Sequence, residues 1–147
     1  MPILTLPIES AGDILTVGFA VSEPRQAAMK KAGLPIPPLV FARGLVDTGA
    51  SCTCVDPTVV QKLQLEPSGT TQMLTPSTGA TPHICSQFDV AVAIVMDARQ
   101  VHVCSLLTPV VESDLSPHGI QALIGRDVLD RGILIYDGCR RQIALAF

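Results

Sequence analysis

The sequence predicts a mostly β, single-domain fold over residues 1–147: a closed β-barrel with one or two short helices. Apolar residues make up 48% of the chain, and they are mainly Val, Leu, Ile and Ala with only 3% aromatic residues, which favours strands. Twelve prolines and 11 glycines divide the chain into short elements. Strand-like segments that follow one another this closely are typical of a closed or folded-over barrel.

The first part of the chain contains two strand-like segments and an interruption. Residues 2–8 and 13–21 are apolar and rich in β-branched residues, which predicts strands. Residues 22–38 are expected to form a loop or insertion. Within it, residues 25–32 form a short helix that ends at Gly33, and the prolines that follow make an extended connector.

The middle of the chain begins with a strand over 39–46. Residues 56–65 are predicted to form a turn or short helix, because Asp56 can cap a helix and Pro57 suits the first helical position. Residues 70–95 have the pattern of a long hairpin with small residues at its tip.

The last part of the chain contains an apolar strand that breaks at Gly125 into a short helix. Residues 133–146 follow as two strands around Asp137-Gly138, which is a strong hairpin signal.

Charge and hydropathy argue against several classes of protein. The net charge of −3, with no basic run longer than two residues, argues against a nucleic-acid partner. The N-terminus lacks the pattern of a signal peptide, and no stretch approaches the ~20 apolar residues of a membrane-spanning helix. The five cysteines, an odd number without framework spacing, indicate free thiols in a reducing compartment, so a cytoplasmic location is expected.

One stretch, RGLVDTGAS at 43–51, ends an apolar run on a carboxylate. Asp47 is followed there by a threonine, a glycine and further small residues. Further along the chain, ALIGRD at 122–127 is an apolar strand that breaks at a glycine before a helix. An isolated D-T-G is most simply a β-turn, since Asp and Gly are common turn residues. Its combination with the downstream motif and a hairpin between them favours a functional loop.

Together these motifs resemble those of the aspartic proteases, specifically the single-domain retroviral type (retropepsins) and their cellular and bacterial relatives. The resemblance extends from about residue 39 to the C-terminus and implies an aspartic endopeptidase that needs no cofactor. Asp47 would be the catalytic carboxylate, and the Thr48 hydroxyl would form a hydrogen bond across a symmetry axis. Gly49 would allow a close approach of backbone, while Ala50 and Ser51 would keep the floor of a substrate cleft small.

The resemblance gives a supporting role to the second motif. Gly125 would let the strand that ends at Ile124 pass close beneath the loop of Asp47, and a helix over 126–131 would pack against it. Asp127 has the simpler interpretation of an acid in the first turn of a helix, where the helix dipole favours it. We therefore do not predict it to be a second catalytic acid.

Two departures from the viral pattern are visible. The positions that are acidic in many viral members are Ser51 and Cys52 here, so Arg126 needs a partner that the sequence does not identify. The tail 133–146 continues through a hairpin, which is more similar to the cellular and bacterial relatives.

The hairpin 70–95 lies where the family places its flap, which covers bound peptide and excludes water. Ser77, Thr78, Gly79 and Ala80 at its tip are therefore predicted to contact substrate. A plain polar hairpin loop is the alternative interpretation of this segment.

Peptide hydrolysis by carboxylates requires two of them to share a proton. Because the chain contains a single D-T-G, the second carboxylate is expected to be Asp47 of another copy, in a homodimer that acts on peptide or protein. The strands of 133–146, together with 2–8, are predicted to form the dimer interface, with a plain core strand as the alternative for the tail. A non-catalytic dimerisation or peptide-binding module is the alternative function.

No metal site is predicted. Cys52 and Cys54 would share one face of a strand, where both can be small buried hydrophobic residues. No second pair of ligands follows at zinc spacing, and no local signature links a histidine to a cysteine nucleophile.

Overall fold

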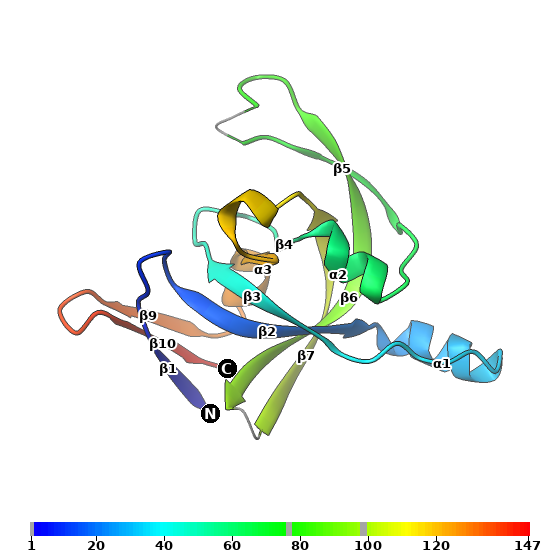
Figure 1. Ribbon diagram of the computed structural model, residues 1–147, viewed down its shortest axis with the longest axis horizontal. Helices are drawn as coiled ribbons and strands as arrows, with labels where there is room; N and C mark the ends of the chain where they lie inside the picture. Colours follow the sequence, from blue (N-terminus) through cyan, green and yellow to red (C-terminus); the bar gives the residue numbers. More distant parts are fainter. Residues whose placement is uncertain (1, 76–77, 98–99) are drawn as a thin grey trace.

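The structure, a computed structural model, describes residues 2–75, 78–97 and 100–147. These residues form a β-rich body, from which one helix and one hairpin project (Figure 1). The elements, in chain order, are β1 (Ile3–Pro7), β2 (Ile14–Val21), α1 (Glu23–Lys31), β3 (Val40–Val46), β4 (Cys54–Val55), α2 (Pro57–Lys62), β5 (Gly69–Met73), β6 (His83–Asp97), β7 (Gln100–Glu112), a 3-10 turn (Ser116–His118), β8 (Ala122–Ile124), α3 (Arg126–Leu129), β9 (Ile133–Asp137) and β10 (Gln142–Ala146).

Six strands close into a barrel. Their order is β2-β3-β8-β4-β7-β6, and β6 pairs back with β2 to complete the ring. Its interior is filled by aliphatic residues and a few aromatic ones, and Val17, Phe19, Val90 and Ile124 are almost fully buried. The predicted fold class, a mostly β closed barrel, is confirmed. The described residues contain three short α-helices, more than the one or two expected, because each of the three helix-like segments of the sequence forms one.

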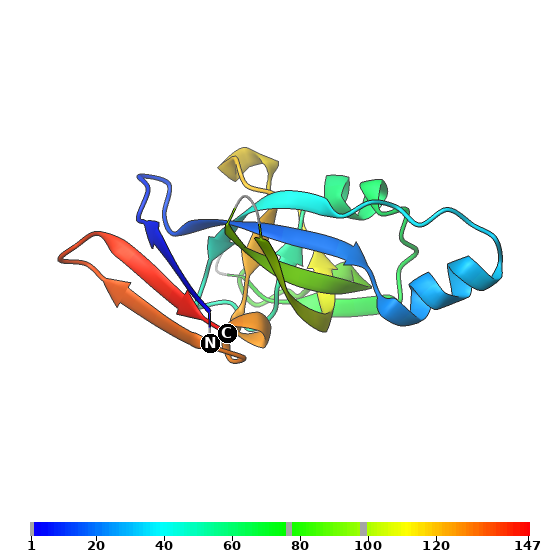
Figure 2. The same ribbon diagram turned by 90° about the horizontal axis from the view of Figure 1, so that it is seen from below.

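Helix α1 begins two residues before the predicted start, because Pro24 is accommodated in its first turn. It ends before Gly33, which adopts a left-handed backbone with φ +68°. None of its residues is buried, and it extends away from the barrel (Figures 1 and 2).

Helix α2 begins as predicted, with Asp56 as its cap and Pro57 in its first turn. The Asp56 side chain accepts hydrogen bonds from the Thr58 amide at 3.0 Å, the Thr58 hydroxyl at 2.7 Å and the Leu115 amide at 3.2 Å. Burial raises the pKa of Asp56, but these hydrogen bonds to the charged form outweigh that effect and lower the pKa below its ordinary value.

The hairpin predicted over 70–95 is present, but its strands pair over a shorter length. β5 pairs antiparallel with only the first part of β6, from Gly69 opposite Gln87 to Met73 opposite His83. The rest of β6 belongs to the barrel, where it pairs with β2 and β7. We refer to residues 69–87 as the outer hairpin; in it, β5 is the last strand of the seven-stranded sheet.

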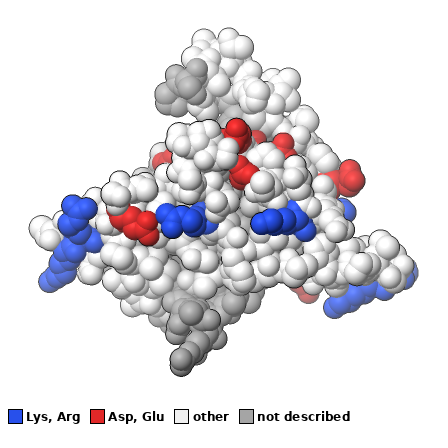
Figure 3. All heavy atoms as spheres, viewed as in Figure 1, with Lys and Arg blue, Asp and Glu red and all other residues white. Residues whose placement is uncertain are grey.

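A second, three-stranded sheet joins the two ends of the chain. Its order is β1-β10-β9, so the N- and C-terminal strands are neighbours (Figure 2). One face buries Ile143 and Leu145 against the barrel. The other face carries Ile3, Ile133 and Ile135, which are 68%, 53% and 57% exposed. Charged side chains lie in separate groups on the face of the molecule shown in Figure 3.

Candidate active site

The two sequence motifs meet because β3 and β8 pair in parallel. Val46 lies opposite Ile124, so the residues that follow both strands leave the sheet at the same edge. The Asp47 amide donates to the Ile124 carbonyl at 3.0 Å, and the Arg126 amide donates to the Ala50 carbonyl at 2.9 Å. The aspartate loop, which we define as residues 47–53, is therefore attached by its backbone to the start of α3.

The loop holds the Asp47 carboxylate by a short hydrogen bond. The Gly49 amide donates to Asp47 Oδ1 at 2.8 Å, and the Ala50 amide donates to the Asp47 carbonyl at 3.2 Å. A Cβ at Gly49 would lie 3.0 Å from Asp47 Oδ1, so a side chain there would displace the carboxylate. Asp47 is half-buried, while Thr48, Gly49 and Ser51 are exposed.

Gly125 lies directly against the backbone of the aspartate loop. A Cβ at this position would be 2.5 Å from both the carbonyl carbon and the carbonyl oxygen of Cys52. Because these are backbone atoms of a tethered loop, they cannot move aside easily. The break between β8 and α3 therefore requires glycine for close packing, although its φ of −88° is ordinary.

Thr53 connects the loop to α3, a role that the sequence did not reveal. Its side chain is fully buried, and its hydroxyl donates to Asp127 Oδ1 at 2.7 Å and accepts from the Gly125 amide at 3.1 Å. The Thr53 amide donates to Asp127 Oδ2 at 2.9 Å, and the Val128 amide donates to Asp127 Oδ1 at 2.9 Å. The only sequence signal for this role is that Thr53 is the one hydroxyl residue within the apolar run of residues 52–55.

Arg126 has a partner that no side-chain pattern could identify. Its Nη1 donates to the Thr48 backbone carbonyl at 2.8 Å. The guanidinium therefore supports the aspartate loop through its backbone.

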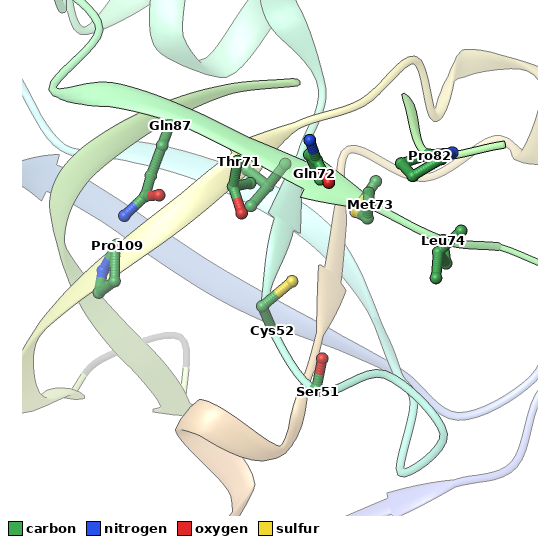
Figure 4. Close-up of a pocket in the computed structure, with 10 residues that line it drawn as sticks. Ser51, Cys52, Thr71, Gln72, Met73, Leu74, Pro82, Gln87 and Pro109 are labelled. Carbon is green, nitrogen blue, oxygen red and sulfur yellow. The ribbon is translucent and has the colours of Figure 1, made fainter. Parts of the chain in front are cut away.

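A cavity of about 520 Å³ lies between the aspartate loop and the outer hairpin (Figure 4). Residues on its walls include Ser51, Cys52, Met73, Leu74, Pro109 and Val111. Of the residues predicted to bind substrate, Ser51 lines it and Ala50 does not. The sequence did not identify the cavity residues of β5 and β7, because these two strands come together with the aspartate loop only when the barrel closes.

The described residues of the hairpin tip, Thr78, Gly79 and Ala80, form a turn and are not among the residues that line the cavity. The Thr75 amide donates to the Thr78 hydroxyl at 2.8 Å, which in turn donates to the Thr75 carbonyl at 2.9 Å. Gly79 has a left-handed backbone with φ +60°, and Ala80 follows it in the turn. Ser77, predicted to contact substrate, lies outside the described residues.

The pKa of the Cys52 thiol is lowered. The Cys54 thiol donates a hydrogen bond to the Cys52 sulfur, which lowers the pKa of Cys52 to about 7 against the opposing effects of burial and of the Asp127 charge. The same hydrogen bond, together with burial, raises the pKa of Cys54. In the described part of the chain, no group of three or more His, Cys, Asp or Glu residues could hold a metal ion.

Comparison with solved structures identifies the architecture. A retropepsin-like aspartic protease from Rickettsia conorii matches over 97% of this chain and 89% of its own, with a TM-score of 0.56 and 15% identity. The chain has the retropepsin-like fold. The retroviral protease-like domain of Ddi1 from Leishmania major matches over 86% of this chain and 83% of its own, with a TM-score of 0.41 and 13% identity. No protein-family model and no curated protein sequence matches the chain.

The retropepsin-like fold confirms the resemblance first seen in the D-T-G-A and I-G-R-D motifs. At 15% identity, the likeness establishes the architecture, so the roles of individual residues depend on their own geometry. None of the helices in the described ranges is long and apolar enough to cross a membrane.

Proposed function

We propose that residues 1–147 form one retropepsin-like domain that acts as a homodimeric aspartic endopeptidase. The observation that carries this proposal is the setting of Asp47. Its half-buried carboxylate is held by the Gly49 amide. Asp47, Thr48, Gly49 and Ala50 are not among the residues that line the cavity, but Ser51 and Cys52, further along the same loop, are. A concave site on the loop that carries an accessible carboxylate suits hydrolysis of a bound peptide.

The reaction requires two carboxyl groups that share one proton. The ionised Asp47 takes a proton from a water molecule, whose oxygen attacks the carbonyl carbon of the scissile peptide bond. The protonated Asp47 of the other copy donates its proton to the carbonyl oxygen. The tetrahedral intermediate then collapses as a proton passes to the nitrogen and the C–N bond breaks. Like charges held close together cannot both ionise easily, which keeps one carboxyl group protonated.

The second carboxyl group must come from a second copy of the chain. Asp127, which follows the other motif, already accepts three hydrogen bonds from Thr53 and Val128 and so serves the structure. Thr48 and Gly49 are exposed beside Asp47, so they are free to contact the same loop of a partner. A two-fold axis at this loop would place the two Asp47 side chains together.

The exposed face of the β1-β10-β9 sheet supports the same dimer. Ile3 and Ile133 both neighbour Ala146 in the register, and Ile135 neighbours Ala144, so these isoleucines lie on one face. All three are more than half exposed. A contiguous apolar face of this kind is typical of a subunit interface.

The substrate is proposed to be an extended peptide. β5 ends the seven-stranded sheet, so its outer edge is available to pair with a further strand next to the cavity. The hairpin tip would close over that peptide through Thr78, Gly79 and Ala80. The peptide would then be recognised through its main chain by the edge of β5 and through its side chains by the cavity. Ser51 would contact it from the loop.

The test is the substitution Asp47→Asn. We expect it to reduce cleavage of a peptide library by about a thousandfold or more, because it removes the groups that transfer protons. The urea midpoint and the dimer mass should stay close to those of the parent. Asp130→Asn, at an exposed carboxylate that follows α3, is the matched control and should retain full activity.

Two results would contradict the proposal. One is full cleavage activity in the Asp47→Asn protein. The other is a parent protein that forms a stable dimer and binds peptides but cleaves none of them, which would identify a binding module instead. Activity per chain should also fall on dilution below the dissociation constant of the dimer.

A further inference from the structure

Three thiols and a thioether gather where the aspartate loop meets the outer hairpin. Cys54 and Cys85 are buried in one cluster, and Cys52 packs against it from the loop. Cys54 Sγ lies 3.9 Å from Met73 Sδ, and Cys85 Sγ lies 3.9 Å from the His83 carbonyl oxygen. The sulfur atoms therefore come from the loop, from β4 and from both strands of the hairpin.

Cys52 differs from the other two thiols in its access to solvent. It is only half-buried and lines the cavity, where Figure 4 shows it on the loop opposite Met73. The interpretation of a small buried hydrophobic residue therefore applies to Cys54 but not to Cys52. A thiol that is accessible within a cavity and lies next to a cluster of buried sulfur atoms has the setting of a reactive cysteine.

We propose that Cys52 is a site of reversible covalent modification, at which a low-molecular-weight disulfide that enters the cavity forms a mixed disulfide with the protein. The cavity of about 520 Å³ is within the usual size range of small-molecule sites. Its walls at Met73, Leu74 and Val111 are apolar, while Ser51 and Gln72 offer hydrogen bonds to a polar adduct.

The chemical step is a thiol–disulfide exchange. Cys52 first loses its proton to solvent. Its thiolate attacks one sulfur of the disulfide RS–SR, so a bond forms between Cys52 Sγ and that sulfur while the S–S bond of the reagent breaks. The leaving thiolate RS⁻ takes a proton from solvent. Cys52 is oxidised and one half of the reagent is reduced, so no further co-reactant is needed.

The neighbouring thiol activates Cys52 without displacing the adduct. The Cys54 thiol keeps its proton and donates a hydrogen bond to the Cys52 sulfur; this bond and burial both raise the pKa of Cys54. Because Cys54 remains a protonated thiol, it is a poor nucleophile toward a mixed disulfide. The mixed disulfide at Cys52, not a Cys52–Cys54 disulfide, is therefore the expected product.

The expected rate follows from two opposing effects. With a pKa of about 7 in place of 9.0, Cys52 has about 50-fold more thiolate at pH 7. Lower basicity reduces the intrinsic nucleophilicity by about eightfold. Loss of the hydrogen bond from Cys54 should therefore slow the reaction at pH 7 by at least about sixfold.

The experiment uses the Cys104→Ser/Cys139→Ser protein, so that Cys52, Cys54 and Cys85 are the only thiols left in the chain. The protein is incubated with glutathione disulfide from pH 6 to pH 9, and the adduct is followed by intact mass and located by peptide mapping. We expect one reducible adduct on Cys52, with a rate that levels off above about pH 7. The proposal would be overturned if the protein kept its original mass after incubation, or if adducts formed only on other cysteines.

Two variants of the neighbouring thiol separate activation from simple exposure. Cys54→Ala removes the hydrogen-bond donor and should slow the modification of Cys52 at pH 7 by about sixfold or more. Cys54→Ser keeps a donor and should restore most of the rate. Equal rates in the two variants would refute the role of Cys54, provided that circular dichroism shows both to be folded.

The consequence for activity rests on the proposed protease function. An adduct on Cys52 would occupy the cavity that is proposed to hold the peptide, so proteolysis should be lost on modification and regained with dithiothreitol. The mapped adduct does not depend on activity, so the two proposals fail separately. If Cys52 forms the adduct but the protein never cleaves peptides, only the proposed protease function is contradicted. If the fully modified protein cleaves as fast as the parent, the expected inhibition by the adduct is contradicted.

Discussion

Replacing Thr53 by valine removes one hydroxyl group and preserves the shape of the side chain. In the parent, this hydroxyl donates to the Asp127 carboxylate at 2.7 Å and accepts from the Gly125 amide at 3.1 Å, within a fully buried site. The substitution therefore leaves a buried amide without its acceptor and removes one charge-assisted hydrogen bond.

The magnitude follows from these two losses. A hydrogen bond to a charged group contributes about 1.5–3 kcal/mol, and an unsatisfied buried amide costs about 1–3 kcal/mol. Because the two effects share one hydroxyl, we expect Thr53→Val to lower the free energy of unfolding by about 3 kcal/mol or more. Thr53→Ser keeps the hydroxyl and loses one buried methyl group, which costs about 1 kcal/mol.

The assay is urea unfolding of the two variants and the parent at the same protomer concentration, since dimerisation would make the midpoint depend on concentration. The serine variant should be more stable than the valine variant by about 2 kcal/mol, although valine is the more hydrophobic residue. A valine variant as stable as the serine variant would show that the hydroxyl network does not hold the aspartate loop to α3.

Three further predictions concern the packing, the interface and the pH dependence of the fold. Gly125→Ala should cost about 1–3 kcal/mol because its Cβ meets loop backbone at 2.5 Å, whereas Gly69→Ala, with no atom within 4 Å of its Cβ, should be nearly neutral in the same urea assay. Ile135→Asp should raise the dissociation constant of the dimer by about a hundredfold in sedimentation equilibrium. Leu34→Asp, at a residue that is 56% exposed, is the control and should leave this constant unchanged. A stable Ile135→Asp dimer would place the interface elsewhere. Asp56→Asn should cost about 1 kcal/mol or more at pH 7, because the amide nitrogen of asparagine cannot accept the hydrogen bond that Asp56 Oδ2 takes from the buried Leu115 amide. Since folding lowers the pKa of Asp56, this stabilisation is present above about pH 4 and is lost as the pH falls through the lower native pKa. The parent and the variant should therefore converge in stability at acid pH, and a constant difference would refute the charge-dependent cap.

Local patterns in the sequence predicted the elements that depend on local chemistry. The Asp56-Pro57 pair predicted the start of α2, and Asp137-Gly138 predicted the final hairpin, whose turn spans 138–141. The apolar run before Asp47 predicted β3, and Gly125 predicted the break before α3. Each of these signals lies within a few residues of the structure it specifies.

Features that depend on barrel closure could not be predicted in this way. The cavity brings Cys52 together with Met73 and Val111, which come from three separate strands or loops. The partner of Arg126 is a backbone carbonyl, and backbone groups carry no identity in the sequence. The outer hairpin is shorter than predicted because β6 continues into the barrel as one unbroken apolar strand.

The difference between the two carboxylates near the loop illustrates the same limit. Asp47 and Asp127 both lie close to a glycine, and either could be a catalytic acid on composition alone. Asp127 accepts three hydrogen bonds from Thr53 and Val128, so its oxygens are already engaged within the fold. Asp47 is held by the Gly49 amide, and it stays half-exposed beside two exposed residues. The hydrogen-bond donors around Asp127, which come from a buried threonine and from backbone amides, therefore engage its carboxylate within the fold. Asp47 has fewer such donors and stays accessible, as the proposed protease requires.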